Sequence, residues 1–351
     1  MSIFKAHITA MSAYKPPLDG RDAQRHLLLD FNERTLPVSQ PVQHALIDYI
    51  QSGRLQMYPA YGDIVDKIAA YAGVKPEQAM ITNGSDQGIE LIIRSACREG
   101  DEAIIPGKGF AFYSQCARVE NLTILEPQYQ FETGFPFEAV LAAISPRTRV
   151  ICLASPNNPS GTPISREQII AIAQAAPHSA ILVDECYYEY VQQTVADLVD
   201  ELPNLVVTRT FSKTWGIPSL RLGYILSNAA NIKALLNVRG PYDVNQLAVV
   251  AIRAALEQPE FVHTYVQEVM TQSKPLLEQY LNGKGIRFWP SVSNYLWTFP
   301  AQPQAVADAL QAAGILVRPN ADPQGNLGLR MTLGTLEQTQ RLISELDKVL
   351  S

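Results

Sequence analysis

The stretch NLVVTRTFSKTWGIPSLRLGY, residues 204–224, decides how the rest of the chain is interpreted. It opens with an apolar, β-branched run at 205–207, which is typical of a buried strand. Lys213 follows at the carboxyl end of that predicted strand, where ligands of α/β proteins bind, so it is a candidate amine nucleophile. The alternative is a solvated loop lysine. Hydroxyl side chains and two arginines crowd the same stretch, however, and this composition is typical of a phosphate pocket.

On both sides of this stretch, short apolar strands alternate with helical patterns. Strands are predicted at 26–32, 79–82, 102–105, 122–125, 149–154, 180–183, 205–207 and 222–225, and helices at 41–50, 63–72, 87–98, 110–117, 136–144 and 165–175. Strands separated by helices indicate an α/β fold whose sheet is mostly parallel, with right-handed crossovers. Polar clusters follow strand after strand, so we expect them along one edge of that sheet.

The pattern changes beyond residue 240. Helices are predicted at 245–256, 259–281, 305–313 and 336–350, and strands at 287–289, 295–299, 315–318 and 327–333. These elements indicate a smaller α+β C-terminal domain attached to the long helix. With 351 residues, the chain exceeds the roughly 100–200 residues typical of one domain. We expect a large domain at 46–257 and a small domain at 258–351, to which an arm and first strand at 1–45 contribute.

The first 25 residues are polar and are broken by Pro16, Pro17 and Gly20, so they predict an extended arm without a helix. Arms of this kind often dock on a partner subunit. The segment lacks the long apolar core of a signal peptide.

Composition excludes two classes of partner. Apolar residues make up 47% of the chain and charged residues 18%, which is ordinary for a soluble globular protein. The net charge of −6 predicts no broad basic surface for a nucleic acid. No run reaches the roughly 18 apolar residues of a membrane span, so we expect no membrane insertion.

Cysteine and histidine usage indicates a reducing compartment and no metal site. The four cysteines are scattered in apolar surroundings, which favours free thiols over disulfides. The five histidines show no metal-ligand spacing. We expect a cytoplasmic protein.

An imine between Lys213 and a pyridine aldehyde would need three kinds of partner. A carboxylate should face the ring nitrogen, and Asp184 follows an apolar strand at a suitable place. The ring oxygen needs hydrogen-bond donors, for which Asn158 and Tyr187 are candidates, and Phe110 is a candidate for stacking on the ring. The alternatives are a cap at Asp184, a proline turn at Asn158, and core packing for the two aromatic residues.

A phosphate group would need a helix N-terminus, hydroxyl groups and an arginine. The strand at 79–82 is followed by a glycine turn and then a helix, an arrangement that attracts anions. The candidate phosphate ligands are Gly84, Ser85, Asp86, Thr210, Ser212 and Arg221. Asp86 should cap the helix through its side chain, because its own charge opposes a phosphate. The alternative is an ordinary helix with Ser85 or Asp86 as its N-cap.

Several short motifs together resemble one protein family. The chain carries NPSG at 158–161, DECY at 184–187, SK at 212–213 and RLGY at 221–224. Their order and spacing resemble those of the fold-type I, pyridoxal-phosphate-dependent aminotransferases of class I/II over nearly the whole chain. Within that family, the Tyr58-Pro59 loop, NGSD at 83–86, PYDVN at 241–245 and LRMTLGT at 329–335 most resemble histidinol-phosphate aminotransferase.

The resemblance implies pyridoxal 5′-phosphate as the cofactor, bound in the large domain and linked covalently to Lys213, which then also moves the substrate proton. It implies that Asp184 pairs with the pyridinium nitrogen and that Tyr187 and Asn158 address the ring oxygen. The implied phosphate ligands are Ser85, Asp86, Thr210, Ser212 and Arg221. Tyr58 is expected to reach the cofactor phosphate of the other subunit, which makes the protein a homodimer with shared active sites.

The resemblance also implies a substrate site. Arg330 matches the arginine that takes the carboxylate of glutamate or the phosphate of the amino-phosphate substrate, and Arg318 and Tyr14 are further candidates for the same anion. The alternative for Arg318 is a surface ion pair. The implied reaction, part of histidine biosynthesis, converts L-histidinol phosphate and 2-oxoglutarate into imidazole acetol phosphate and glutamate.

Two other enzymatic functions fit the same motifs equally well, and two non-enzymatic functions fit them less well. An aromatic amino acid aminotransferase and a phosphothreonine decarboxylase would use the same cofactor, and motif spacing does not separate them from the first hypothesis. A non-catalytic regulator would carry an added DNA-binding domain, for which about 25 residues before the first strand leave no room. A purely structural protein leaves Lys213, Asp184 and Arg221 unexplained together.

Overall fold

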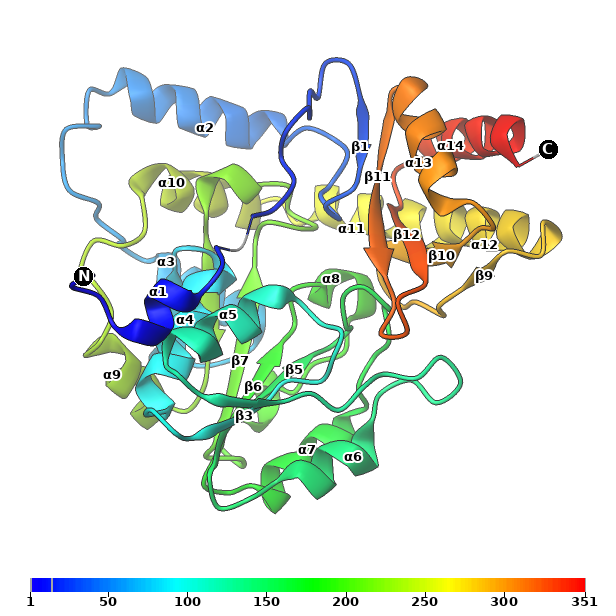
Figure 1. Ribbon diagram of the computed structural model, residues 1–351. Helices are drawn as coiled ribbons and strands as arrows, with labels where there is room; N and C mark the ends of the chain where they lie inside the picture. The colour runs from blue at the N-terminus through cyan, green and yellow to red at the C-terminus, as the bar shows by residue number, and fades with distance from the viewer. Residues whose placement is uncertain (1, 14, 351) are drawn as a thin grey trace.

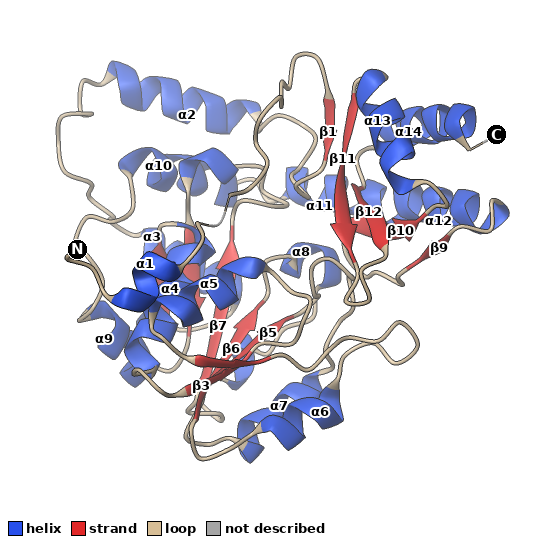
Figure 2. Cartoon of the chain, in the orientation of Figure 1, coloured by secondary structure: helices blue, strands red, loops and turns tan. Residues whose placement is uncertain are grey.

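The computed structural model describes residues 2–13 and 15–350. The chain forms two β-sheets, and in Figure 1 the larger sheet lies below the smaller one. Helices cover both sheets (Figure 2). In the part of the chain that is described, no helix is long and apolar enough to cross a membrane.

Within the described residues, the larger sheet has seven strands in the order β2-β8-β7-β6-β5-β3-β4. These strands are β2 Ala79–Thr82, β3 Glu102–Ile104, β4 Thr123–Leu125, β5 Thr148–Ala154, β6 Ala180–Asp184, β7 Leu205–Thr210 and β8 Gly223–Leu226. Strands β4, β3, β5, β6 and β7 pair in parallel, whereas β8 runs antiparallel to both β2 and β7. The prediction of a mostly parallel sheet in an α/β fold is confirmed.

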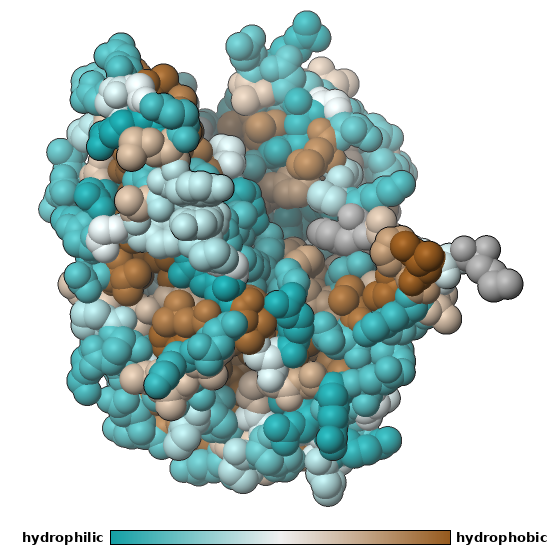
Figure 3. Space-filling view, turned by 90° about the vertical axis from the view of Figure 1, so that its left-hand side faces the viewer, coloured by the Kyte–Doolittle hydropathy of each residue, from teal (hydrophilic) through white to brown (hydrophobic). Residues whose placement is uncertain are grey.

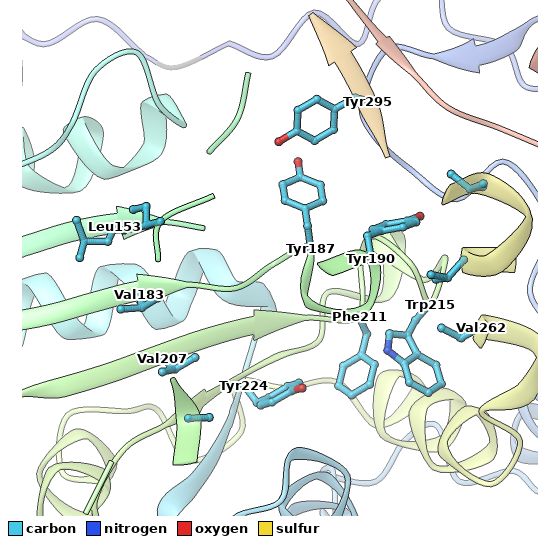
Figure 4. Close-up of a cluster of buried hydrophobic side chains, with 14 of the residues drawn as sticks. Leu153, Val183, Tyr187, Tyr190, Val207, Phe211, Trp215, Tyr224, Val262 and Tyr295 are labelled. Atoms are coloured by element: carbon cyan, nitrogen blue, oxygen red, sulfur yellow. The ribbon is translucent and has the colours of Figure 1, made fainter. Parts of the chain in front are cut away.

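Both faces of this sheet are buried, because its strands are apolar at consecutive positions. In β5, Val150 and Cys152 pack in one apolar layer and Ile151 and Leu153 in the other. Buried residues on both faces are typical of parallel sheets covered by helices on each side. Figure 4 shows Leu153 beside residues of the next strands in its layer. The first layer includes α4 Gly84–Ala96, α5 Ala111–Val119 and α9 Ala229–Leu236, and the second includes α6 Phe137–Ala143 and α7 Arg166–Ala175.

The smaller sheet has the strand order β1-β11-β12-β10-β9. Its strands are β1 Leu27–Leu29, β9 Arg287–Phe288, β10 Tyr295–Phe299, β11 Ile315–Ala321 and β12 Leu327–Thr332, and α13 Pro303–Ala312 and α14 Leu336–Val349 pack near it. Strand β1 pairs in parallel with β11, with Leu27 opposite Ile315. The N-terminal segment therefore adds a strand to a sheet made otherwise from the C-terminal part of the chain.

A long helical segment, predicted at 259–281, links the two sheets. It consists of α11 Glu260–Glu268, a π-helical turn Val269–Ser273 and α12 Lys274–Gly283, which follow one another without a break. Pro275, which has no N–H group to donate, lies at the start of α12. Helix α11 packs against α8 Tyr188–Val191, which follows β6, whereas α12 packs against α14 and β9.

Three α-helices of the described residues were not predicted. The N-terminal arm contains α1 Ala6–Ala10, which packs against α5, so the prediction of an arm without a helix is wrong. Helices α8 and α9 are also missing from the prediction; the Asn228 side chain caps α9 by accepting a hydrogen bond from the Asn231 N–H group. The remaining helices, α2 Gln40–Gln51, α3 Ile64–Ala72 and α10 Gln246–Leu256, lie within two residues of their predicted bounds.

Candidate active site

The candidate site lies at the carboxyl ends of β5, β6 and β7. Asp184 is the last residue of β6, and Asn158 follows the end of β5 in the chain. Parallel pairing places Asp184 beside Ala154 of β5 and beside Thr208 of β7. The polar groups after these strands therefore share one edge of the sheet.

The Asp184 carboxylate is buried and is held by two hydroxyl groups. The Tyr113 hydroxyl donates to Oδ2 at 2.6 Å, and the Thr208 hydroxyl donates to Oδ1 at 3.0 Å. Burial raises the pKa of Asp184 to about 6, and the two hydrogen bonds oppose that shift. Neither hydroxyl is predicted as a partner of Asp184, because Tyr113 lies on α5 and Thr208 on β7, both distant from Asp184 in the sequence.

The Tyr187 hydroxyl receives two amide donors. Asn32 Nδ2 donates to it at 2.9 Å and Asn158 Nδ2 at 3.3 Å. The ring is buried and packs edge-on against Tyr295, with centroids 5.2 Å apart, and the two side chains point toward one another in Figure 4. Burial raises the pKa of Tyr187, so its hydroxyl keeps the proton that it can donate. Asn32 is not among the residues predicted for the site.

The Lys213 amine is half-buried and contacts the N-terminal segment. Its Nζ donates to the Phe31 carbonyl oxygen at 2.9 Å and lies 5.9 Å from the centroid of the Tyr187 ring. Burial lowers the pKa of Lys213. A larger fraction of this amine is therefore neutral than in an exposed lysine, and only the neutral amine acts as nucleophile or base.

Two glycines let the start of α4 approach the loop before β8. Gly84 has φ +71°, and a Cβ there would lie 2.6 Å from Arg221 Nη2. A Cβ on Gly223 would lie 2.5 Å from the Ser85 nitrogen. With both side chains absent, backbone N–H groups at the helix start and the Arg221 guanidinium lie close together, as an anion site requires.

Asp86 does not cap α4, contrary to the expectation. The helix begins at Gly84, three residues earlier than predicted, and its N-cap is Asn83, so neither Ser85 nor Asp86 is the N-cap. Asp86 instead accepts a hydrogen bond from Arg221 Nη2 at 2.5 Å. An anion arriving at Arg221 would therefore compete with the Asp86 carboxylate.

Three other predicted residues lie along the same edge. Thr210 ends β7, and its hydroxyl donates to the Ser212 hydroxyl at 3.0 Å. Phe110 is the N-cap residue of α5, one position outside the helix in which it was predicted. Its ring stands edge-on to Tyr113, with centroids 5.7 Å apart.

Arg330 and Arg318 are two cationic residues on neighbouring strands of the smaller sheet. They lie directly opposite each other on β12 and β11. Arg330 is buried; its Nη2 donates to the Asp30 carbonyl at 2.6 Å and its Nη1 donates to Asn158 Oδ1. Its Nε is buried without a hydrogen-bond partner among the described residues. Arg330 thus joins the smaller sheet to the Asn158 loop of the larger one.

The segment 30–33 enters the site, although none of its residues is among those predicted for it. The Arg21 guanidinium makes two hydrogen bonds to the Asp30 carboxylate, at 2.9 and 3.1 Å, and a further ion pair with Glu33. The centroid of the Phe31 ring lies 4.5 Å from Arg21 Cζ and 5.3 Å from Arg318 Cζ. The segment therefore carries the Phe31 carbonyl and Asn32 to the larger sheet. In the sequence, the feature that could have pointed to this segment is an aromatic residue, Phe31, between the two acids Asp30 and Glu33.

One predicted residue, Tyr58, is not brought to this cluster. Tyr58 lies on the exposed loop after α2, is 77% exposed and stacks on Tyr242 with centroids 4.5 Å apart. Tyr14 lies outside the described residues. Among the described residues of one chain, the cluster is therefore formed without Tyr58.

A cavity of about 450 Å³ opens at the opposite end of the same strands. Arg149, Ala180 and Asn204, near the amino ends of β5, β6 and β7, are among the residues that line it. None of the predicted site residues that the structure describes lines this cavity. It is therefore separate from the chemistry at the carboxyl ends.

Comparisons with known proteins agree on one family. The sequence model of "Aminotransferase class I and II" matches residues 26–346. The chain is similar to "Histidinol-phosphate aminotransferase 2" of Hydrogenovibrio crunogenus, with 32% identity over 362 residues, covering 98% of this chain and 95% of that protein. It is also similar to the protein of the same name from Legionella pneumophila, with 34% identity, covering 90% of this chain and 87% of that protein.

A solved structure shows the same fold. The histidinol-phosphate aminotransferase of Sinorhizobium meliloti, in complex with pyridoxal-5′-phosphate, superposes with a TM-score of 0.88. The match covers 100% of this chain and 98% of that chain, at 22% sequence identity. The larger sheet, the smaller sheet and the helix between them thus belong to a known architecture.

Proposed function

The chain belongs to the aminotransferase class I and II family, and from this premise we propose that it transfers an amino group from L-histidinol phosphate to 2-oxoglutarate. The products are imidazole acetol phosphate and glutamate, and the reaction is a step of histidine biosynthesis. The enzyme is an aminotransferase of fold type I, and its similarity to histidinol-phosphate aminotransferases extends over nearly the whole chain.

One observation carries the choice of substrate. Arg318 and Arg330 lie opposite each other, beside the Asn158 loop and the segment 30–33. Histidinol phosphate carries a phosphate and no carboxylate, whereas 2-oxoglutarate carries two carboxylates. One pocket must then accept either anion in turn, and a pair of guanidinium groups suits both, because guanidinium binds carboxylate and phosphate through paired hydrogen bonds.

We propose pyridoxal 5′-phosphate as the cofactor, and the residues at the site fit it. The close approach at Gly84 and Gly223 brings the start of α4 beside Arg221, whose guanidinium a phosphate would take over from Asp86, with Ser85, Thr210 and Ser212 as further donors. The buried Asp184 carboxylate needs a cationic partner, which a protonated ring nitrogen would provide. When bound, the cofactor supplies an electron sink for negative charge at the substrate Cα.

We assign the covalent link, the proton transfer and the hydrogen bonds to the ring oxygen to three residues: Lys213, Tyr187 and Asn158. Lys213 Nζ, with its lowered pKa, would link the cofactor covalently, and would later take up the proton that leaves the substrate Cα and deliver it to the C4′ carbon of the cofactor. The Tyr187 hydroxyl and Asn158 Nδ2 would donate to the cofactor's ring oxygen. Asn32 would orient the Tyr187 hydroxyl, to which it donates.

A panel of amino donors tests the proposal. We expect histidinol phosphate to show the highest kcat/KM, above phenylalanine and phosphothreonine, with ketone formed and no carbon dioxide released. A preference for phenylalanine would assign the chain to aromatic amino acids. Carbon dioxide release from phosphothreonine would make it a decarboxylase.

Arg330→Ala is expected to raise the KM for glutamate and for histidinol phosphate about 10- to 100-fold. A hydrogen bond to a charged group contributes about 1.5–3 kcal/mol, and 1.4 kcal/mol corresponds to a factor of about ten. The measurement is steady-state kinetics with each donor. Arg98→Ala, which removes an exposed arginine, is the matched control. Unchanged KM values in Arg330→Ala would move the anion pocket elsewhere.

We further propose a homodimer in which Tyr58 acts in the partner's site. Apolar residues between 49% and 77% exposed gather on α2, on the loop after it and near Tyr242, namely Ile47, Ile50, Leu55, Met57, Tyr58 and Tyr242. Exposed apolar surface of this kind marks interaction sites. The space-filling view of the side of the molecule that carries α2 shows apolar groups between the polar ones (Figure 3).

Mixing two defective variants tests this sharing. Tyr58→Ala and Lys213→Ala are each expected to have low activity. Refolded together, they should regain about a quarter of wild-type activity, because half of the dimers are mixed and one of their two sites is intact. If Tyr58 acts within its own chain, no mixed dimer contains an intact site and the mixture stays inactive.

The four cysteines are free in the structure, and burial raises the pKa of each thiol. Unreactive free thiols suit a reducing compartment. We therefore propose the cytoplasm as the location, which cell fractionation can test.

A further inference from the structure

The Asp184 carboxylate has a partner from outside the sheet. The Tyr113 hydroxyl donates to Oδ2 at 2.6 Å, while Thr208 of the neighbouring strand donates to Oδ1 at 3.0 Å. Tyr113 is 2% exposed and Asp184 is 3% exposed, so water has little access to this contact. Each carboxylate oxygen therefore has its own protein donor.

The two donors restrict how the carboxylate can turn. Thr208 holds one oxygen from the plane of the sheet, because it pairs with Asp184 in the parallel ladder. Tyr113 holds the other oxygen. It lies on α5, which belongs to the helical layer that covers one face of the sheet. Rotation of the carboxylate about its Cβ–Cγ bond would break both hydrogen bonds, so its orientation is set before any ligand arrives.

Helix α5 places Tyr113 with little freedom. The Tyr113 N–H group donates to the Phe110 carbonyl at 3.2 Å in the first turn of the helix. The two rings meet edge-on at 5.7 Å. One helical turn thus carries both the aromatic ring proposed to stack on the cofactor and the hydroxyl that contacts Asp184.

Hydrogen bonding also stabilises the charged form of Asp184. Burial favours its neutral form, whereas a hydroxyl donor stabilises its anion. The other titratable groups around it are Asp86 from α4, Cys152 from β5, and Cys186 and Tyr187 just after β6. Asp86 opposes ionisation and the others lose protons only at higher pH, so the two hydroxyl donors are the protein groups that favour the anion most directly.

We propose that Tyr113 is a positioning residue whose hydroxyl keeps the Asp184 carboxylate ionised and turned toward the cofactor's ring nitrogen. This inference rests on the proposed cofactor. It assigns to Tyr113 no contact with substrate or cofactor, and its effect passes through Asp184 alone.

The test is Tyr113→Phe, which removes the hydroxyl and keeps the ring. We expect the cofactor-free variant to bind pyridoxal phosphate about 10-fold more weakly, measured by titration calorimetry. We also expect the acidic limb of its kcat/KM profile to move up by roughly one pH unit, because losing a donor disfavours the carboxylate anion. Thr208→Val, which removes the second donor, should change both quantities in the same direction.

Tyr129→Phe is the matched control, because Tyr129 is a buried tyrosine in the other apolar layer. It should leave the affinity and the pH profile unchanged, and thermal unfolding should show that all variants fold. If Tyr113→Phe folds and keeps both wild-type values, the inference is overturned while the proposed function stands. If the wild-type protein takes up no pyridoxal phosphate, the proposed function itself fails.

Discussion

Lys213→Ala is expected to lower kcat for transamination about 10⁴-fold or more. A general base contributes about 10²–10⁴-fold, and this variant also loses the amine that would hold the cofactor covalently. Treatment with borohydride followed by peptide mass spectrometry should find the cofactor attached at position 213 in the wild-type protein and nowhere in the variant.

The loss should come from chemistry and not from folding. Lys213 is half-buried and its side-chain hydrogen bond is to a single carbonyl, that of Phe31, so alanine leaves little of the structure unsupported. Lys233→Ala, which removes an exposed lysine on α9, should keep wild-type turnover. Turnover within tenfold of wild type in Lys213→Ala would show that another group is the base.

Asp184→Asn is expected to lower kcat about 10³-fold while making the cofactor-free protein more stable. The loss of activity follows because an amide cannot pair with a protonated ring nitrogen as a carboxylate does. The gain in stability follows because a buried carboxylate is costly when no cation faces it. Activity and stability are thus predicted to change in opposite directions at one residue.

The pH dependence of this stability gain can be worked out from the Asp184 pKa. Burial raises that pKa from 3.8 to about 6, so between these values the folded state binds a proton that the unfolded state lacks. Wild-type stability therefore falls by about 3 kcal/mol as pH rises through this window, because each pH unit within it lowers the free energy of unfolding by about 1.4 kcal/mol. Asp184→Asn removes this loss, so its advantage should be largest at pH 8 and vanish near pH 4.

Urea unfolding of the cofactor-free proteins between pH 4 and pH 8 measures this difference. Asp308→Asn, an exposed aspartate on α13, is the control and should show no advantage at any pH. A difference between Asp184→Asn and wild type that does not change with pH would show that the Asp184 carboxyl is not the titrating group.

Much of the fold could be predicted from local patterns. The bounds of β2 and β10 agree with the prediction, because each is a short apolar run between polar turns. Strand β7 continues through Thr210, whereas its prediction stopped at 207. Its polar residues are buried because they have partners that the sequence does not display: Thr208 donates to Asp184, and Arg209 forms an ion pair with Glu185.

Contacts between residues that are distant in the sequence also limit how much of the site could be predicted. Lys213, Asp184 and Tyr187 follow strand ends and belong to recognisable motifs. Asn32 and Tyr113 do not, since each acts through a contact with a residue far along the chain. Such contacts arise only when helices pack on the sheet and the N-terminal segment joins the smaller sheet.

The pairing of β1 with β11 sets the order of events during synthesis. Leu27 leaves the ribosome early, but its partner Ile315 emerges only when nearly the whole chain has been made. At about 5–20 residues per second, the N-terminal strand waits on the order of tens of seconds for its partner. The Phe31 carbonyl and Asn32 reach their places only after that wait, so an unfinished or truncated chain cannot assemble a working centre.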